Sequence, residues 1–407
     1  MSRPPRPSRG IICLALALLA LWPARAAAST PKPPEIPARE WLLIDAGDHK
    51  RLAAHDPDDS RAMASTTKLM TAYLSLRELP LKKELTAPAY HPIPGESLLG
   101  LEPGERMTVR DLLYGLLLPS GNDAAVTLAD GAAGSTEAFV DQMNKAARRL
   151  GLDDTNYANP IGLDAPNNYS SARDLANLAL TLRHNALFRR IVNTPRITLH
   201  SGEHPRTIEN HNDLVITHPW INGVKTGYTP DAGNVLVASG TQKGATLLSV
   251  VMGAPSIPVR DSDTLKLLDY GFSLYSRQQA VRSGQRLASA RVPNADTKVP
   301  LEAKGDLSAT VRRGQKIDVT VHAPKSVKAP IHRGEKIGVA RATLVGDPVG
   351  SVPLVAGRGV KPTPPSSPIA DVDEVLPGPR IVVWIICIGL VAIVILIGTA
   401  LVRRSSG

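Results

Sequence analysis

Cysteine is nearly absent from this chain of 407 residues, which contains Cys13 and Cys387 and no others. Both cysteines lie in apolar segments close to the two ends. The long body between them therefore has no thiol, which excludes disulfide bonds and cysteine-ligated metal sites there. The sequence also has no convincing internal repeat.

Acidic residues are missing from both ends of the chain. Residues 1–28 hold four arginines and residues 380–407 hold three, while neither segment holds an aspartate or a glutamate. Without these arginines the 47 basic residues fall to 40 against 37 acidic ones, a balance of about +3 for residues 29–379. The high isoelectric point is thus largely a property of the ends, and it gives little support to nucleic-acid binding.

Residues 1–28 have the pattern of a secretory signal peptide. Three arginines precede an apolar run from Ile11 to Leu21, and small residues follow from Ala24 to Ala28. About eleven apolar residues are too few to span a bilayer, which argues against the alternative of an N-terminal membrane anchor. We therefore expect this segment to be removed and the body to be exported.

The segment 381–402 is an uncharged stretch of 22 residues, long enough to cross a membrane as a helix. Arg403 and Arg404 follow it directly, as expected at a cytoplasmic end under the positive-inside rule. We expect a single-pass protein of the cell membrane, with residues 403–407 in the cytoplasm and the body on the extracytoplasmic side. A buried core helix is the alternative, which the terminal position and the all-round apolarity disfavour.

The part between these ends is long enough for two domains with linkers. Residues 29–39 and 357–380 are rich in proline and are interpreted as linkers. Residues 40–276 combine predicted helices with late predicted strands, which indicates an α+β domain with an antiparallel sheet. Residues 277–356 contain short apolar segments separated by glycine and charged turns, which predicts a small all-β domain.

The elements expected in residues 40–276 follow from apolar spacing and from capping residues. Pro119 ends one predicted helix, whose N-cap is Thr108. Further helices are expected at 64–79, 122–132 and 136–150, and strands at 41–44, 234–239 and 245–252.

Three short motifs occur in one order, and the first is Ser65-Thr66-Thr67-Lys68 at the start of a predicted helix. A serine hydroxyl is a weak nucleophile until a base removes its proton, and a lysine three residues later lies on the same helical face. Lys68 can act as that base only in its neutral form, which requires burial or a neighbouring cation such as Lys225 to lower its pKa. Taken alone, the pair is more often a first-turn serine and a solvated lysine. A second S-x-x-K, from Ser29 to Lys32, contains Pro31 and is not expected to be helical.

The other two motifs are Ser120-Gly121-Asn122 and Lys225-Thr226-Gly227. The first follows the helix that ends at Pro119, where a hydroxyl can pass a proton to a leaving amine and an amide can hold a substrate backbone group. The second is expected at the end of an edge strand, where lysine and threonine can bind a carboxylate and Gly227 admits another backbone. A capping turn and a basic hairpin turn are the respective alternatives. The order of all three motifs favours one shared site.

Longer segments around these motifs resemble the low-molecular-mass penicillin-binding proteins, the serine-type D-alanyl-D-alanine carboxypeptidases. The resemblance spans about residues 38–275 and is weaker over 277–356, which looks like their C-terminal domain. It implies a penicillin-binding/β-lactamase-like transpeptidase domain of the α+β class, followed by a small all-β domain and a C-terminal transmembrane helix. The matching segments are Ala64–Thr71, Pro119–Ala125, Asn159–Asp164, Tyr169–Ala176 and Asn222–Thr229.

The resemblance implies a catalytic role for four motif residues. Ser65 is expected to be the acylated nucleophile and Lys68 its general base. Ser120 and Asn122 are expected in the proton relay and the network that holds the substrate. The backbone N–H groups of Ser65 and Tyr228 would form the oxyanion hole.

Five residues are expected to bind the substrate through the same resemblance. Lys225 and Thr226 would hold its terminal carboxylate, with Gly227 and Tyr228 beside them on the strand. Arg260 is expected to support that carboxylate, and a solvated arginine at a helix start is the alternative. Some members carry histidine where this chain has Tyr228, a departure that bears on pH dependence or deacylation.

The function that the resemblance implies is a membrane-anchored serine DD-carboxypeptidase of peptidoglycan maturation. Ser65 would release the terminal D-alanine of the stem pentapeptide and pass the acyl group to water, with no metal or organic cofactor. The expected partners are the acyl-D-Ala-D-Ala stem peptide, β-lactam inhibitors and the membrane. The alternatives are a DD-transpeptidase or endopeptidase, a non-catalytic wall-binding module, and a β-lactamase, for which we identify no deacylating glutamate.

Overall fold

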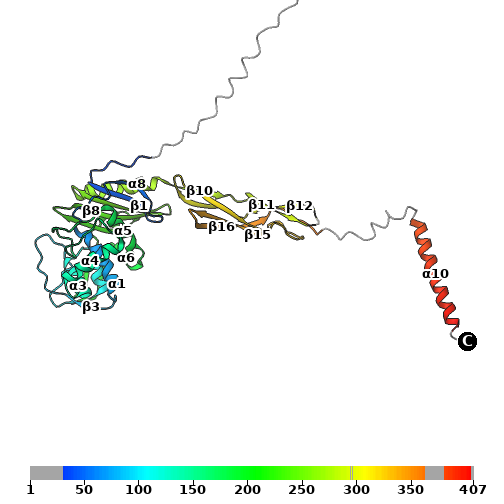
Figure 1. Cartoon of the computed structure of the whole chain (residues 1–407), viewed down its shortest axis with the longest axis horizontal. Helices are drawn as coiled ribbons and strands as arrows, with labels where there is room; N and C mark the ends of the chain where they lie inside the picture. The colour runs from blue at the N-terminus through cyan, green and yellow to red at the C-terminus, as the bar shows by residue number, and fades with distance from the viewer. Residues whose placement is uncertain (1–30, 294, 296, 363–379, 405–407) are drawn as a thin grey trace, which may run out of the picture. The chain divides into compact units, whose positions relative to one another are not determined.

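The computed structural model describes residues 31–293, 295, 297–362 and 380–404. The chain forms two structural units (Figure 1), described separately below: Met1–Arg277 with Thr310–Gly314, and Gln278–Ala309 with Gln315–Gly407. The expected signal peptide at 1–28 and most of the expected linker at 357–380 lie outside the described residues.

A five-stranded antiparallel sheet is the centre of the first unit, with its strands in the order β2-β1-β9-β8-β7. Leu42 and Ile44 of β1 pack into one hydrophobic cluster, while Trp41 and Leu43 pack into another on the opposite face. Because both faces are covered, β1, β8 and β9 carry continuous apolar runs, and the strands expected at 41–44, 234–239 and 245–252 are confirmed. The five strands are β1 (Glu40–Asp45), β2 (Arg51–His55), β7 (Ile221–Thr229), β8 (Gly233–Gln242) and β9 (Ala245–Ala254).

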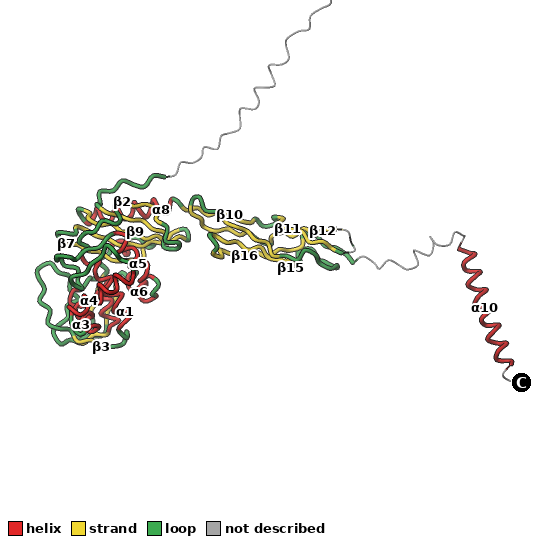
Figure 2. Tube along the Cα trace, in the orientation of Figure 1, coloured by secondary structure: helices red, strands yellow, loops and turns green. Residues whose placement is uncertain are grey.

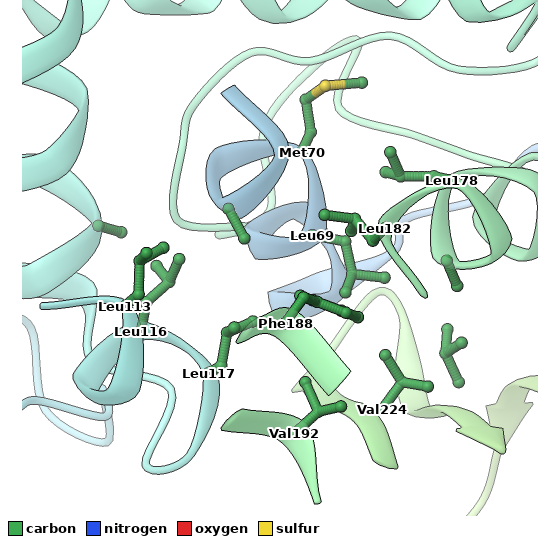
Figure 3. Close-up of a cluster of buried hydrophobic side chains, with 14 of the residues drawn as sticks. Leu69, Met70, Leu113, Leu116, Leu117, Leu178, Leu182, Phe188, Val192 and Val224 are labelled. Carbon is green, nitrogen blue, oxygen red and sulfur yellow. The ribbon is translucent and has the colours of Figure 1, made fainter. Parts of the chain in front are cut away.

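Helices cover both faces of this sheet (Figure 2). On one face lies α8 (Ile257–Ser273), whose close approach depends on Gly271, since a Cβ there would lie 2.4 Å from Leu247 Cδ1. On the other face, Figure 3 shows Leu69, Phe188 and Val224 gathered in one core. These three side chains come from α1 (Lys68–Glu78), α6 (Ala186–Val192) and β7, so this core fixes the first helix against the edge strand.

The start and the end of one helix, α2 (Val109–Leu117), are those that the sequence predicts. The Thr108 side chain accepts a hydrogen bond from the Asp111 N–H at the start of α2, and the helix ends before Pro119. The helix expected over 64–79 is divided into a 3-10 turn, η1 (Ala64–Thr67), and α1 (Lys68–Glu78). Two further helices, α5 (Ala172–Arg183) and α6 (Ala186–Val192), are not among those expected from the sequence. The other elements are α2 (Val109–Leu117), α3 (Asn122–Ala133), α4 (Thr136–Leu150), α7 (Asp213–Thr217), β3 (Glu84–Thr86), β4 (Arg106–Thr108), β5 (Arg196–Leu199) and β6 (Arg206–Glu209).

The second unit is built on a five-stranded antiparallel sheet in the order β11-β12-β16-β15-β14. Val299, Leu301 and Ala303 alternate along β12 and point into its hydrophobic core. The expectation of an all-β region after the α+β domain is therefore confirmed. The strands of this region are β10 (Tyr275–Val281), β11 (Arg286–Val292), β12 (Thr297–Ala303), β13 (Leu307–Arg312), β14 (Ile317–His322), β15 (Lys336–Leu344) and β16 (Asp347–Ala356).

The apolar segment near the C-terminal end forms a single helix, α10 (Arg380–Arg404). Its large side chains from Trp384 to Ile397 are exposed. Among the side chains that the structure describes, no helical run is both long enough and apolar enough to cross a membrane.

Candidate active site

The 3-10 turn η1 holds Ser65 between two segments that approach its backbone very closely. A Cβ on Gly162 would lie 2.1 Å from the carbonyl oxygen of Ala64, and a Cβ on Gly227 would lie 3.0 Å from the Ser65 nitrogen. Ala64 itself has a φ of +50°, in the sparsely populated left-handed region. The two glycines therefore fix the backbone around the Ser65 side chain.

Lys68 begins α1 and is fully buried, with its amine directed at Ser65. Its Nζ lies 3.0 Å from Ser65 Oγ, 2.6 Å from Asn122 Oδ1 and 2.5 Å from the Ile161 carbonyl oxygen. Burial, and then the charge of Lys225, lower the pKa of Lys68 well below its usual range. A neutral amine has two N–H donors, which the Asn122 and Ile161 oxygens accept, so its lone pair is left for the Ser65 hydroxyl. This arrangement can remove a proton from Ser65.

The second motif connects α2 to α3. Ser120 has a φ of +65°, and Asn122 is the first residue of α3. Gly121 is required between them, because a Cβ there would lie 2.8 Å from the Leu99 nitrogen. Within the described part of the chain, the buried Ser120 hydroxyl has no hydrogen-bond partner. Leaving such a group unpaired costs about 1–3 kcal/mol, so this hydroxyl is suited to a partner on a bound molecule.

The third motif lies within the edge strand β7 rather than at its end. The strand continues past the motif to Thr229, whose hydroxyl donates to Asp164 Oδ1 at 2.6 Å. Lys225 is buried and donates to the Thr226 carbonyl oxygen at 2.9 Å. Burial, and then the charge of Arg260, lower the pKa of Lys225 to about 7. A bound anion would favour the charged form of this lysine.

The two remaining candidates differ in exposure. Tyr228 is 64% exposed on β7, whereas Arg260 is buried on α8. The Arg260 guanidinium pairs with Asp261, with Nη2 2.7 Å from Oδ1, so it is not the solvated helix-start arginine of the alternative. The charge of Arg260 also reaches Lys225, which links α8 electrostatically to the third motif.

Two groups near Lys68 are not among the site residues expected from the sequence. One is the carbonyl oxygen of Ile161, and the other is Glu96, whose Oε2 accepts a hydrogen bond from Asn122 Nδ2 at 2.7 Å. Neither has a local chemical signal, because Glu96 lies in a loop and a backbone carbonyl leaves no mark in the residue types. No cluster of three or more metal-ligating side chains occurs among the described residues.

Gly162→Ala is expected to damage the site through the close approach to Ala64. A residue with a side chain at a positive φ costs about 1–3 kcal/mol, and the 2.1 Å contact adds a displacement of η1. Because a shift of about 1 Å at a reacting group can cost roughly 100-fold in rate, we expect acylation of Ser65 by a serine-reactive acylating reagent to fall by about that factor. Gly134→Ala is the matched control, since Gly134 has a similar φ but nothing within 4 Å of its Cβ position. Equal loss of acylation in both variants would contradict this reading.

Comparisons with known proteins extend over both structural units. A model of the D-alanyl-D-alanine carboxypeptidase family, Peptidase_S11, matches residues 27–256, and a model of the penicillin-binding protein 5 C-terminal domain matches residues 275–362. The chain is 34% identical to D-alanyl-D-alanine carboxypeptidase DacC of Escherichia coli, over 83% of this chain and 88% of that protein. It is 31% identical to D-alanyl-D-alanine carboxypeptidase DacF of Bacillus subtilis, over 80% and 86% respectively.

Solved structures show the same similarity. Penicillin binding protein 5 from Haemophilus influenzae aligns with a TM-score of 0.57 at 31% identity, covering 81% of this chain and 99% of that one. The Streptomyces K15 DD-transpeptidase aligns with a TM-score of 0.57 at 36% identity, covering 60% of this chain and 100% of that one.

Proposed function

This chain belongs to the D-alanyl-D-alanine carboxypeptidase family of serine hydrolases, and we propose that it removes the terminal D-alanine from peptidoglycan stem pentapeptides through an acyl-enzyme on Ser65. The contact of 3.0 Å between Ser65 Oγ and the buried Lys68 amine carries this proposal. It joins a nucleophile to a base whose surroundings favour the neutral form. Because β-lactams mimic the acyl-D-Ala-D-Ala bond, they are expected to acylate the same serine.

In the proposed acylation step, Lys68 takes the Ser65 proton as Oγ attacks the carbonyl carbon of the penultimate D-alanine. Backbone N–H groups of Ser65 and Tyr228 would hold the developing oxyanion. As the C–N bond breaks, the Ser120 hydroxyl would give its proton to the leaving amine and recover one from protonated Lys68. Water then attacks the ester on Ser65, which releases the shortened peptide and restores the serine.

The terminal carboxylate of the substrate is proposed to bind the third motif. Lys225 supplies a charge and Thr226 a hydroxyl, and Arg260 adds a second positive charge from α8. Gly227 lets β7 approach the nucleophile turn, with a Cβ position only 3.0 Å from the Ser65 nitrogen. The residues proposed to bind the carboxylate and the Ser65 nucleophile can thus act on the same end of the substrate.

The pH dependence of kcat/KM should reflect the protonation of both Lys68 and Lys225. Lys68 acts in its neutral form, so kcat/KM should rise with pH through its lowered pKa, whereas Lys225 acts in its charged form, so kcat/KM should fall as pH rises through about 7. A bound carboxylate raises the pKa of Lys225. The alkaline limb of kcat, which reports the substrate complex, should therefore lie at higher pH than that of kcat/KM. Initial rates of D-alanine release across the pH range test this prediction. If the alkaline limbs of kcat and kcat/KM coincide, Lys225 does not bind the substrate carboxylate.

The test of the proposed function is D-alanine release from a muramyl pentapeptide by the full chain. Release in water supports the carboxypeptidase. Cross-linked dimers that form when an amine acceptor is added, without release in water, would indicate a transpeptidase. Fast hydrolysis of penicillin would indicate a β-lactamase, and penicillin labelling without any turnover would indicate a non-catalytic wall-binding module.

We also propose that the protein is anchored in the cell membrane by residues 381–402, with its body on the extracytoplasmic side. The support is the uncharged 22-residue sequence and the two arginines that follow it. The full chain should stay with the membrane fraction after alkaline carbonate treatment, while a chain that ends at residue 379 should be released. Recovery of both in the soluble fraction would refute the anchor.

A further inference from the structure

Glu96 lies on the opposite side of Asn122 from Lys68 and is bound to the same carboxamide. Nδ2 of Asn122 donates to Glu96 Oε2 at 2.7 Å, while Oδ1 accepts from Lys68 Nζ at 2.6 Å. The amide thus connects a carboxylate to the amine that contacts Ser65.

The carboxylate determines which end of the Asn122 amide faces Lys68. The two ends of a carboxamide are similar in size but opposite in hydrogen-bonding character. An ionised carboxylate only accepts hydrogen bonds, so Glu96 binds the NH₂ end and turns the oxygen end toward Lys68. In the reverse orientation, the amide oxygen would face the Glu96 carboxylate, and the NH₂ group would compete with the Ser65 hydroxyl for the lysine lone pair.

Glu96 is itself held in its ionised form. The Tyr90 hydroxyl donates to Oε2, and the Ile93 N–H donates to Oε1 at 2.9 Å. Burial raises the pKa of Glu96, but the hydrogen bonds from Tyr90, Asn122 and Ile93 outweigh it and hold that pKa below its usual value. The carboxylate therefore remains an acceptor at neutral pH.

The loop that carries Glu96 is bound to the start of α3. The N–H of Asn122 donates to the Ser97 carbonyl oxygen at 2.8 Å. The Asp123 carboxylate accepts from the backbone N–H groups of residues 99, 100 and 101, each at 2.8 Å. Glu96 and Asn122 are thus part of one connected structure, in which the position of one fixes the position of the other.

We propose that Glu96 is a positioning residue for acylation, which acts through Asn122 by fixing the end of the carboxamide that meets the Lys68 amine. This inference rests on the proposed function, because it takes Lys68 as the base. The charges that act on Lys68 are those of Lys225, Glu96 and Asp123. Burial and Lys225 lower the pKa of Lys68, while the two carboxylates raise it, so Glu96 also limits how far that pKa falls.

The test compares Glu96→Ala and Glu96→Gln with the wild type in the full chain, by the rate of Ser65 acylation by a fluorescent penicillin across the pH range. Glu96→Ala leaves the Asn122 amide without its carboxylate and should slow acylation by about 10- to 100-fold. Glu96→Gln keeps an acceptor and should recover most of that rate. Because it removes a negative charge, it should also move the acidic limb to lower pH, as Lys68 loses its proton more easily. Glu102→Gln, at an exposed position in the same region, is the matched control and should change neither quantity.

Several results would overturn the proposal. Wild-type rates and an unshifted acidic limb in both Glu96 variants would do so, as would equal losses for alanine and glutamine without a shift. A loss confined to hydrolysis of the acyl-enzyme would instead make Glu96 a base for the attacking water. D-alanine release by the wild type, measured in parallel, separates the proposals: normal release with unaffected Glu96 variants removes only this inference, whereas a wild type that neither releases D-alanine nor reacts with penicillin removes both.

Discussion

Ser65→Ala should abolish D-alanine release from the stem pentapeptide, with a loss of roughly 10⁴- to 10⁶-fold relative to the wild type. The reason is that the first bond of the reaction forms to Ser65 Oγ. The Lys68 base, the Ser120 proton relay and the carboxylate-binding residues cannot act without it. Alanine fits the half-buried position of Ser65, so the protein should remain folded. Penicillin labelling should disappear together with turnover, because both reactions would use the same oxygen.

The control for this variant is Ser60→Ala, at an exposed serine whose hydroxyl donates to the Asp154 carbonyl oxygen. It should keep both activities. Residual D-alanine release above about one hundredth of the wild-type rate in Ser65→Ala would point to another nucleophile, given the size of the effect expected for the true one.

Lys68→Met should slow acylation of Ser65 by about 10²- to 10⁴-fold, the usual range for removal of a positioned general base. Methionine approaches the length of lysine and has no amine. The Asn122 and Ile161 oxygens lose their donor, at about 1–3 kcal/mol each, while the cost of burying an amine disappears. The variant should therefore fold and still bind substrate, and the loss should lie in kcat. Single-turnover labelling with penicillin, together with thermal unfolding, measures both quantities.

Lys82→Met is the control for that variant, since Lys82 is exposed near the end of α1. It should leave labelling unchanged. A folded Lys68→Met protein that acylates at the wild-type rate would show that another group removes the Ser65 proton, and the buried contact at 3.0 Å would then have no part in the chemistry.

The parts of the fold that depend on neighbouring residues can be predicted from the sequence. The cap at Thr108, the end of the helix before Pro119 and the apolar strands β8 and β9 follow from neighbouring residues, and the structure confirms them. The division of the first helix into η1 and α1 does not follow from the sequence pattern, which has no signal for the close approach of the distant Gly162 to Ala64. The third motif lies within β7 rather than at its end, and Thr229 beyond the motif donates a hydrogen bond to the distant Asp164.

The candidate site shows the same limit. The three motifs predict the Ser65, Lys68 and Asn122 side chains that the structure brings together. Burial and Lys225 lower the pKa of Lys68, as a base that acts in its neutral form requires. Glu96 could not be found in this way, because its partner Asn122 lies 26 residues later and the two meet through a loop. The burial of Arg260 likewise depends on where α8 packs, which residue types alone do not specify.

The most direct test of the account is to locate the acyl group by mass spectrometry after reaction with penicillin. Trypsin cleavage after Arg61 and Lys68 yields the peptide Ala62–Lys68, in which Ser65 is accompanied by the hydroxyls of Thr66 and Thr67. Fragmentation of that peptide should place one penicillin adduct on Ser65. An adduct on either threonine or on another peptide, or a folded protein that acquires none, would contradict the assignment of Ser65 as the nucleophile.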